Sequence, residues 1–108
     1  MVELFIREFK RAVRENRWQF IRRRKNLEFL GKLGWTEQMV VEYLAENLSP
    51  KHCYKGPEEE RNSSFEPGVI FVFKMVVESF MVYIKIKKIS REEFYAILSF
   101  HEDEGDLL

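Results

Sequence analysis

The second half of the chain contains three runs rich in β-branched and aromatic residues, over residues 69–76, 80–88 and 94–101. Glu78-Ser79 marks a tight hairpin turn between the first two runs, and residues 90–93 form a looser turn before the third. Strands joined by so few residues run antiparallel, because a parallel neighbour needs a crossover of a dozen or more residues. The middle run also alternates between apolar and polar side chains, which is typical of a strand with one buried face. These runs therefore predict an antiparallel meander.

The first half of the chain has helical periodicity instead. Apolar residues recur every three or four positions, and helices are expected over residues 2–16, 25–33 and 36–47. Gly34 is a suitable C-cap for the second helix and Thr36 a suitable N-cap for the third. Residues 18–20 favour a short edge strand. The predicted class is α+β, with N-terminal helices packed on a C-terminal antiparallel β-meander.

The length of 108 residues predicts a single domain over residues 1–108. Hydrophobic residues make up 45% and aromatic residues 15%, which is enough for a core without disulfides. Helices are expected mainly within residues 1–48, the sheet within 69–101, and an acidic tail over 102–108. The segment between the two halves, residues 56–68, is rich in Gly, Pro and Glu and is expected to be a polar loop.

Several classes of protein and site are disfavoured. Cys53 is the only cysteine, which excludes an internal disulfide and suits a reducing cytoplasm. The longest apolar stretch, residues 69–77, falls short of the ~20 residues that cross a bilayer, so no membrane partner is expected. No phosphate-binding glycine loop or zinc-ligand spacing is present, so neither a cofactor nor a metal is expected. His52 and Cys53 are adjacent, and neighbours on an extended segment point to opposite faces, which disfavours a Cys–His nucleophile.

The net charge is zero, but the charge is unevenly distributed along the chain. Residues 1–32 hold ten basic against four acidic side chains, a net charge of +6. Residues 33–67 carry −4 and residues 68–108 carry −2. A polarised domain of this kind can bind a polyanion on one face, although solvated helix faces would give the same pattern.

Two basic segments are candidates for such binding. Residues 22–25 are four consecutive cations, whose mutual repulsion is relieved by a polyanion or an acidic partner; the alternative is a solvated helix start. Residues 54–57 (Tyr-Lys-Gly-Pro) are expected to form a rigid turn that fixes the Lys55 ammonium group beside the sheet, or else an ordinary loop.

A third candidate lies on the polar face of the middle strand, which carries Tyr83, Lys85 and Lys87. If the last two strands pair, His101 comes close to Tyr83. An imidazole, an ammonium and a phenol on one face suit metal-free cleavage of RNA, where one group takes the 2′-hydroxyl proton, another protonates the 5′-oxygen, and a cation stabilises the phosphate. A structural histidine at a strand end is the alternative.

Four segments of the chain form a distinctive series when taken in order. They are Arg24-Lys25-Asn26 with Phe29-Leu30 and Leu33-Gly34, Tyr54-Lys55-Gly56-Pro57-Glu58, Val82-Tyr83-Ile84-Lys85-Ile86, and Leu98-Ser99-Phe100-His101-Glu102. Together they resemble the MqsR-type toxins of bacterial toxin–antitoxin systems. The match in order and spacing extends over roughly residues 5–104. The strand with Tyr-Ile-Lys, followed by Ser-Phe-His, is its most specific part.

This resemblance implies a RelE-like fold, a ribosome-independent endoribonuclease that cleaves mRNA, and a cognate antitoxin protein as partner. By the same resemblance the catalytic residues fall on Lys55, Tyr83 and His101. The sequence departs from the family pattern in two places: the family has Lys at the position of His101, and Gln at about the position of Val72.

We therefore expect a metal-independent endoribonuclease acting on single-stranded RNA. His101 is the expected general acid or base, Lys55 the cation that stabilises the phosphate, and Tyr83 a hydrogen-bonding or proton-relay group. Arg22, Arg24 and Lys85 are expected to contact the RNA backbone, and Tyr54 to meet a base. Two alternatives remain open, a non-catalytic toxin-like interaction module and a nucleic-acid-binding regulator that does not cleave. The oligomeric state is not predicted.

Overall fold

The computed structural model describes residues 1–90 and 93–105 as an α+β fold, which confirms the expected class. The helices are α1 (Val2–Arg14), α2 (Arg24–Leu33) and α3 (Glu37–Asn47), with a short 3-10 helix over Pro50–His52. The strands are β1 (Trp18–Phe20), β2 (Cys53–Glu59), β3 (Gly68–Val77), β4 (Phe80–Ile89) and β5 (Phe94–Glu102). Both predicted caps are confirmed: Gly34 ends α2 in a left-handed conformation, and the Thr36 hydroxyl accepts from the Met39 amide.

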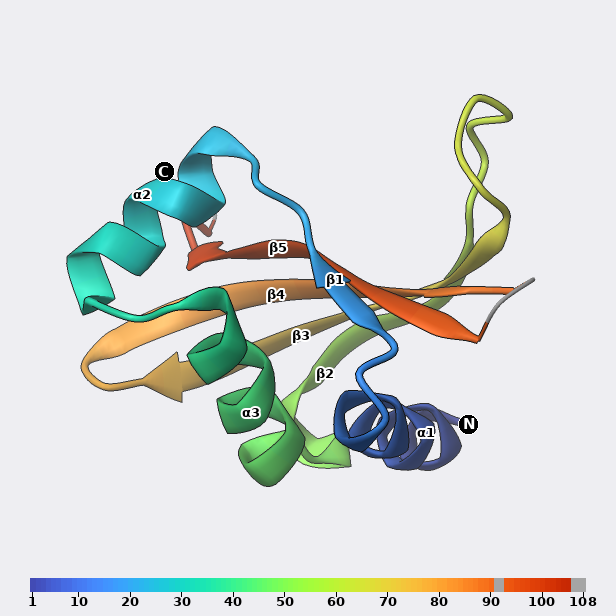
Figure 1. The fold of residues 1–108 in the computed structure, drawn as a ribbon, viewed down its shortest axis with the longest axis horizontal. Coiled ribbons are helices and arrows are strands. Elements are labelled where there is room, and N and C mark those ends of the chain that lie inside the picture. Colours follow the sequence, from blue (N-terminus) through green and yellow to red (C-terminus); the bar gives the residue numbers. More distant parts are fainter. Residues whose placement is uncertain (91–92, 106–108) are drawn as a thin grey trace.

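All five strands form one sheet in the order β1-β5-β4-β3-β2 (Figure 1). The pairs β2–β3, β3–β4 and β4–β5 are antiparallel, and the tight turn predicted at Glu78-Ser79 joins β3 to β4. Two features differ from the expected meander. The edge strand β1 pairs in parallel with β5, and β2 adds a second edge outside residues 69–101.

Strand β2 occupies residues predicted to be a turn and the start of a polar loop. Its pairing with β3 shifts register twice, between Cys53 and Lys55 and between Lys55 and Glu58. Gly56 has φ +128, and a Cβ there would lie 2.9 Å from the carbonyl oxygen of Ile70. Glycine, proline and bulges are tolerated on an edge strand because half of its backbone groups need no partner strand. The residues of β2 have the composition of a loop, and for this reason the sequence does not predict this strand.

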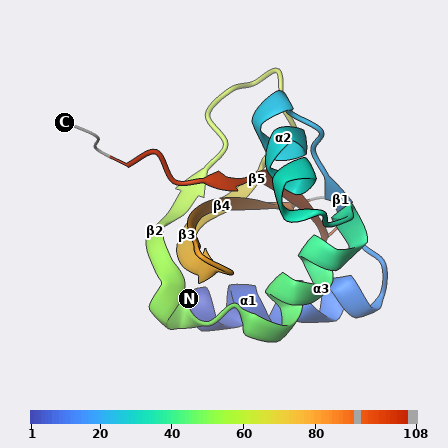
Figure 2. The same cartoon turned by 90° about the vertical axis from the view of Figure 1, so that its left-hand side faces the viewer.

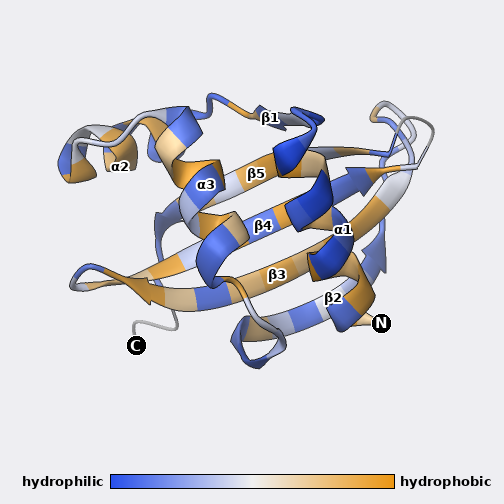
Figure 3. Cartoon of the chain, turned by 60° about the horizontal axis from the view of Figure 1, so that its bottom comes forward, coloured by the Kyte–Doolittle hydropathy of each residue, from blue (hydrophilic) through white to orange (hydrophobic). Residues whose placement is uncertain are grey.

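The hydrophobic core lies between one face of the sheet and the helices α1 and α3 (Figure 2). Both helices lie across the strands with polar residues directed outward (Figure 3). Phe5 and Phe9 of α1 contact the Tyr95 ring of β5, with ring centroids 5.5 and 5.7 Å apart. Phe71 and Phe73 alternate with residues of the opposite face, which places both rings of β3 in the core. The sheet's other face is left free of α1 and α3.

Helix α2 lies beside β5, beyond the point where β1 ends (Figure 1). Its Asn26 is fully buried and makes three hydrogen bonds. The amide donates to the carbonyl oxygens of Ile21 (2.8 Å) and Leu98 (3.1 Å), and its oxygen accepts from the Phe100 amide (3.0 Å). The side chain therefore provides hydrogen-bond partners for backbone groups of β5 at the point where the pairing with β1 ends. It also fixes α2 to that edge of β5.

The first residue after β2, Glu60, contacts a lysine on the free face of the sheet. Glu60 accepts a hydrogen bond of 2.8 Å from the ammonium group of Lys87, whose side chain is only 6% exposed. Lys87 lies on the same side of β4 as Tyr83 and Lys85, as the alternation predicts, but it is buried rather than available to a ligand.

Stability should depend on pH through this pair. The hydrogen bond from Lys87 lowers the pKa of Glu60 in the folded protein. The ionised Glu60 therefore contributes fully to folding stability above the ordinary carboxyl pKa, and this contribution is lost as the pH falls through the lowered pKa. We expect Glu60→Gln to reduce the free energy of unfolding near neutral pH, and to differ less from wild type in acid. Denaturant titrations across a pH series measure this difference. Glu59→Gln is the control, and identical pH curves for Glu60→Gln and wild type would contradict the prediction.

The predicted acidic tail is only partly a separate segment. Glu102 belongs to β5, and the amide of Asp103 donates to the Met81 carbonyl oxygen at 2.8 Å. Residues 106–108 lie outside the described residues, as do residues 91–92 of the predicted looser turn. Each helix within residues 1–90 and 93–105 is too short or too polar to traverse a lipid bilayer.

Candidate functional site

The free face of the sheet carries two rows of mostly polar side chains, because residues opposite each other in antiparallel strands project from the same side. The first row joins Lys55, Val72, Lys85 and Ser99 across four strands. The second joins Lys74, Tyr83 and His101 across β3, β4 and β5. We call this surface, made of these seven residues, the open face.

Tyr83 and His101 are direct partners in the β4–β5 ladder, which confirms the predicted juxtaposition. Their rings stack with centroids 5.6 Å apart and an angle of 17° between the planes. Both side chains are partly exposed. A phenol and an imidazole are therefore presented together at the end of the sheet.

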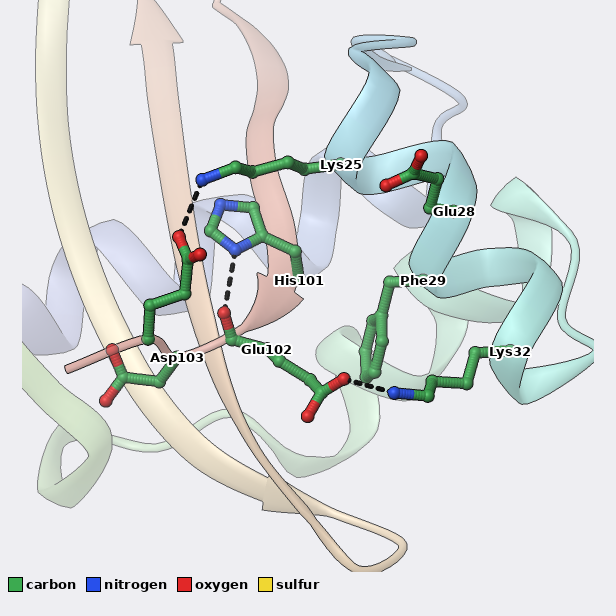
Figure 4. A pocket seen from close by; sticks show the side chains of 8 residues that line it. Lys25, Glu28, Phe29, Lys32, His101, Glu102 and Asp103 are labelled. Carbon is green, nitrogen blue, oxygen red and sulfur yellow. Dashed lines mark hydrogen bonds and ion pairs between the residues drawn. The ribbon is translucent and has the colours of Figure 1, made fainter. Parts of the chain in front are cut away.

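The hydrogen bond of His101 determines which of its nitrogens carries the proton. Nδ1 lies 2.9 Å from the carbonyl oxygen of Glu102 (Figure 4). A carbonyl oxygen can only accept, so Nδ1 is the donor, and in the neutral ring Nε2 holds the lone pair. The backbone thus orients the imidazole with its basic nitrogen away from the strand, as required of a general base.

Lys74 lies at the β3 end of the second row, and no sequence motif singled it out. Its ammonium group lies 3.9 Å from the centroid of the Tyr54 ring and 3.1 Å from an oxygen of Asp103. These contacts hold the lysine between β2 and the segment after β5. Tyr54 itself is 56% exposed. Its outer surface is consequently available to an aromatic base.

An open cavity of about 340 Å³ connects these groups. Its lining comprises Tyr54, Lys55, Lys74, Tyr83, His101, Asp103, Glu104 and Gly105. Three separate strands thus bring the predicted Lys55, Tyr83 and His101 to one cavity, together with Tyr54. Lys55 is half-exposed, and its nearest carboxylate oxygen, on Glu58, is 3.8 Å away.

Two predicted RNA-binding residues lie elsewhere, near the start of α2. Arg22 donates to Glu37 at 2.6 Å, which raises the pKa of its guanidinium group, and Arg24 pairs with Glu28 at 3.1 Å. Neither arginine lines the cavity around His101. Both side chains are largely exposed, at 72% and 90%. They are available to a polyanion but do not belong to the cavity.

Val72 and Lys85 lie next to Lys55 in the first row. Val72 has no exposed surface, and it separates the two lysines across the sheet. Lys85 is partly exposed and belongs to none of the ion pairs found in the described part of the chain. The centre of the open face is therefore apolar, with a cation on either side.

The His52–Cys53 pair does not form a nucleophilic site. Nδ1 of His52 accepts from the Ser49 amide at 3.1 Å, and the Cys53 sulfur lies 4.0 Å from the Lys55 carbonyl oxygen. Burial lowers the pKa of His52 and raises the pKa of the Cys53 thiol. The imidazole is therefore committed to the backbone, and the sulfur is held as the less reactive thiol.

A second cavity, of about 580 Å³, opens between α2 and the end of β5. Lys25, Glu28, Phe29 and Lys32 of α2 face His101 and residues 102–104 across it (Figure 4). Lys25 pairs with Glu104, and Lys32 with Glu102, each at 2.6 Å. His101 is shared by both cavities.

Among residues 1–90 and 93–105, no three His, Cys, Asp or Glu side chains gather in a way that would hold a metal ion. No protein-family profile matches the chain, and neither a curated protein nor a solved structure matches it.

Proposed function

We propose that this protein is an endoribonuclease that cleaves single-stranded mRNA without a metal ion. The observation that carries the proposal is the convergence of His101, Tyr83 and Lys55 on one open cavity. These three groups supply a base, a hydroxyl donor and a cation within reach of a single phosphodiester. Partly exposed side chains on a sheet face also suit an extended strand of RNA.

In this proposal Nε2 of His101 takes the proton of the ribose 2′-hydroxyl, because Nδ1 is already committed as a donor to Glu102. The 2′-oxygen then attacks phosphorus as the bond to the 5′-oxygen breaks. The products are a 2′,3′-cyclic phosphate and a fragment with a 5′-hydroxyl. Tyr83 stacks on the imidazole, and its hydroxyl donates the proton that the departing 5′-oxygen takes up. The proton taken by His101 returns through solvent to the Tyr83 oxygen, which restores both groups for the next cleavage.

Lys55 is the cation that stabilises charge on the phosphate in the transition state. It is the half-exposed lysine of the cavity, whereas Lys74 is held by Asp103 and Tyr54. Lys85 follows in the first row and contacts the backbone of the same strand of RNA. Tyr54 offers its exposed ring for stacking on a base.

The wider biological role rests on the resemblance to MqsR-type toxins. We infer a cytoplasmic toxin with a RelE-like fold that acts independently of the ribosome and is neutralised by a cognate antitoxin protein. Arg22 and Arg24 lie near the start of α2, outside the cavity, and extend the RNA-binding surface. A small adjacent reading frame encoding a DNA-binding antitoxin would be the corresponding genetic observation.

Cleavage by the purified protein in EDTA is the direct test. We expect wild-type protein to cut a single-stranded RNA and leave a 2′,3′-cyclic phosphate, detected by mass spectrometry of the fragments. A 2′-deoxy nucleotide at the cleavage position should abolish cutting there, because it removes the nucleophile. An intact RNA in every condition, or a cut that tolerates the 2′-deoxy substitution, would refute the proposed chemistry.

One observation favours a second candidate, a toxin-like module that binds without cleaving. Val72 is fully buried where the MqsR-type pattern has Gln, so the centre of the open face lacks a polar group. Such a module would bind RNA or a protein with an intact product. The EDTA experiment distinguishes the two candidates.

A further inference from the structure

The cavity between α2 and the end of β5 has no assigned ligand, although it shares His101 with the candidate active site. We propose that it binds a backbone phosphate of the RNA next to the cleaved one, through Lys25 and Lys32, in place of Glu104 and Glu102. This proposal rests on the proposed function, because it identifies a second phosphate position along the same substrate.

The two lysines are placed to act together. They are seven residues apart on α2, two helical turns, and therefore lie on one face of the helix. Both ammonium groups line the same cavity as the His101 ring. A strand of RNA that places its 2′-hydroxyl at His101 passes this wall, because the cavity opens directly beside the ring (Figure 4).

The groups that hold these lysines are carboxylates at hydrogen-bonding distance. Lys25 donates to Glu104 and Lys32 to Glu102, both at 2.6 Å. A phosphate oxygen accepts from an ammonium group in the same way that a carboxylate oxygen does. The two glutamates thus mark positions where phosphate oxygens can bind, and they must move aside for RNA to enter.

This exchange is energetically easy. The side chains of both pairs are about half exposed, at 61% and 65% for Lys25 and Glu104, and 54% and 46% for Lys32 and Glu102. An exposed ion pair shifts an equilibrium by about fivefold at most. Asp103 differs, because its backbone amide is bonded to Met81 and its side chain holds Lys74. The acidic segment can therefore release α2 without leaving the sheet.

Binding of a 2′-O-methyl octanucleotide tests the proposal without cleavage, because the nucleophile is blocked. Fluorescence anisotropy over a range of salt concentrations gives the affinity and its salt dependence. We expect K25Q/K32Q to bind about tenfold more weakly, with a slope of log affinity against log salt reduced by about 1.4. We expect E102Q/E104Q to bind about tenfold more tightly.

Two matched controls remove the effect of net charge. K10Q/K51Q also lowers the net charge by two, but at positions away from the cavity. E42Q/E46Q removes two negative charges on α3. Both control variants should bind the octanucleotide within about twofold of wild type. Equal effects of the cavity variants and their controls would overturn the proposal. The proposal would also be overturned if the cavity bound inorganic phosphate, and K25Q/K32Q abolished that binding while octanucleotide affinity stayed unchanged, since the cavity would then hold a free anion and not the RNA.

The outcome is separable from that of the proposed function. If the octanucleotide binds as described and natural RNA stays intact, the phosphate subsite stands and the nuclease proposal fails. If RNA is cleaved while K25Q/K32Q binds like wild type, the nuclease proposal stands and the subsite fails. Thermal unfolding of each variant confirms that these exposed substitutions leave the fold intact.

Discussion

His101→Ala should lower the rate of RNA cleavage by about 10²- to 10⁴-fold, the range expected for loss of a general base. The hydrogen bond from Nδ1 to the Glu102 carbonyl oxygen leaves Nε2 as the basic nitrogen. Alanine has no nitrogen that could accept the proton of the 2′-hydroxyl. Single-turnover cleavage in EDTA, followed on a labelled RNA, measures the loss. Growth inhibition in cells should disappear in parallel.

The chain provides a matched control in its other histidine. His52 binds the Ser49 amide and does not line the cavity around His101, so His52→Ala should retain cleavage. His101 is partly exposed at the end of β5, and its replacement should leave the unfolding midpoint nearly unchanged. Full cleavage by a folded His101→Ala protein would exclude His101 as the base.

Asn26→Leu should lower the free energy of unfolding by about 4 kcal/mol, because three buried backbone groups lose their partner at once. Leucine has a similar size, so the change removes hydrogen bonds without leaving a large cavity. A loss of this size is a large fraction of the 5–15 kcal/mol that is typical of a domain. Denaturant titration measures it.

Asn47 provides the comparison, since its amide also donates to a backbone carbonyl, that of Tyr43 at 2.9 Å, but on an exposed surface. Asn47→Ala should cost less than about 0.5 kcal/mol, because water replaces the lost bond. If both substitutions cost the same, Asn26 would not be the group that fixes α2 to β5. Asn26→Asp should cost at least as much as Asn26→Leu, because a buried carboxylate oxygen would face the carbonyl oxygens of Ile21 and Leu98.

The juxtaposition of Tyr83 and His101 is predictable from the sequence because short turns fix the order of the strands. The position of Lys74 is fixed in the same way, although no motif marks this residue. A two-residue turn at Glu78-Ser79 sets the register of β3 against β4, and counting outward from it places Lys74 opposite Tyr83. The strand register alone thus predicts that Lys74 lies beside Tyr83. A single lysine within an apolar run nevertheless draws little attention, because such a residue is also found in strands at the edge of a sheet.

Other parts of the site depend on tertiary structure. Lys25 and Glu104 are 79 residues apart, and their contact is set by how α2 lies against β5, which no local pattern records. Strand β2 is hidden for a different reason, because Gly56 and Pro57 are turn residues that an irregular edge strand also accepts. Lys55 therefore belongs to the sheet itself, in β2, and not to a turn beside it, although its side chain still lines the cavity with Tyr83 and His101.

The parallel pairing of β1 with β5 has a consequence for the order in which this chain folds. Residues 18–20 find their partners at residues 95–97, so the sheet closes only after nearly the whole chain is available. Contacts of such high contact order form late, after the loop entropy has been overcome. The edge of β5 that β1 and Asn26 cover is therefore completed late. The cavity around His101 is lined instead by β2–β5 and the segment after them, whose strands pair with their neighbours in sequence, so its formation does not wait for β1.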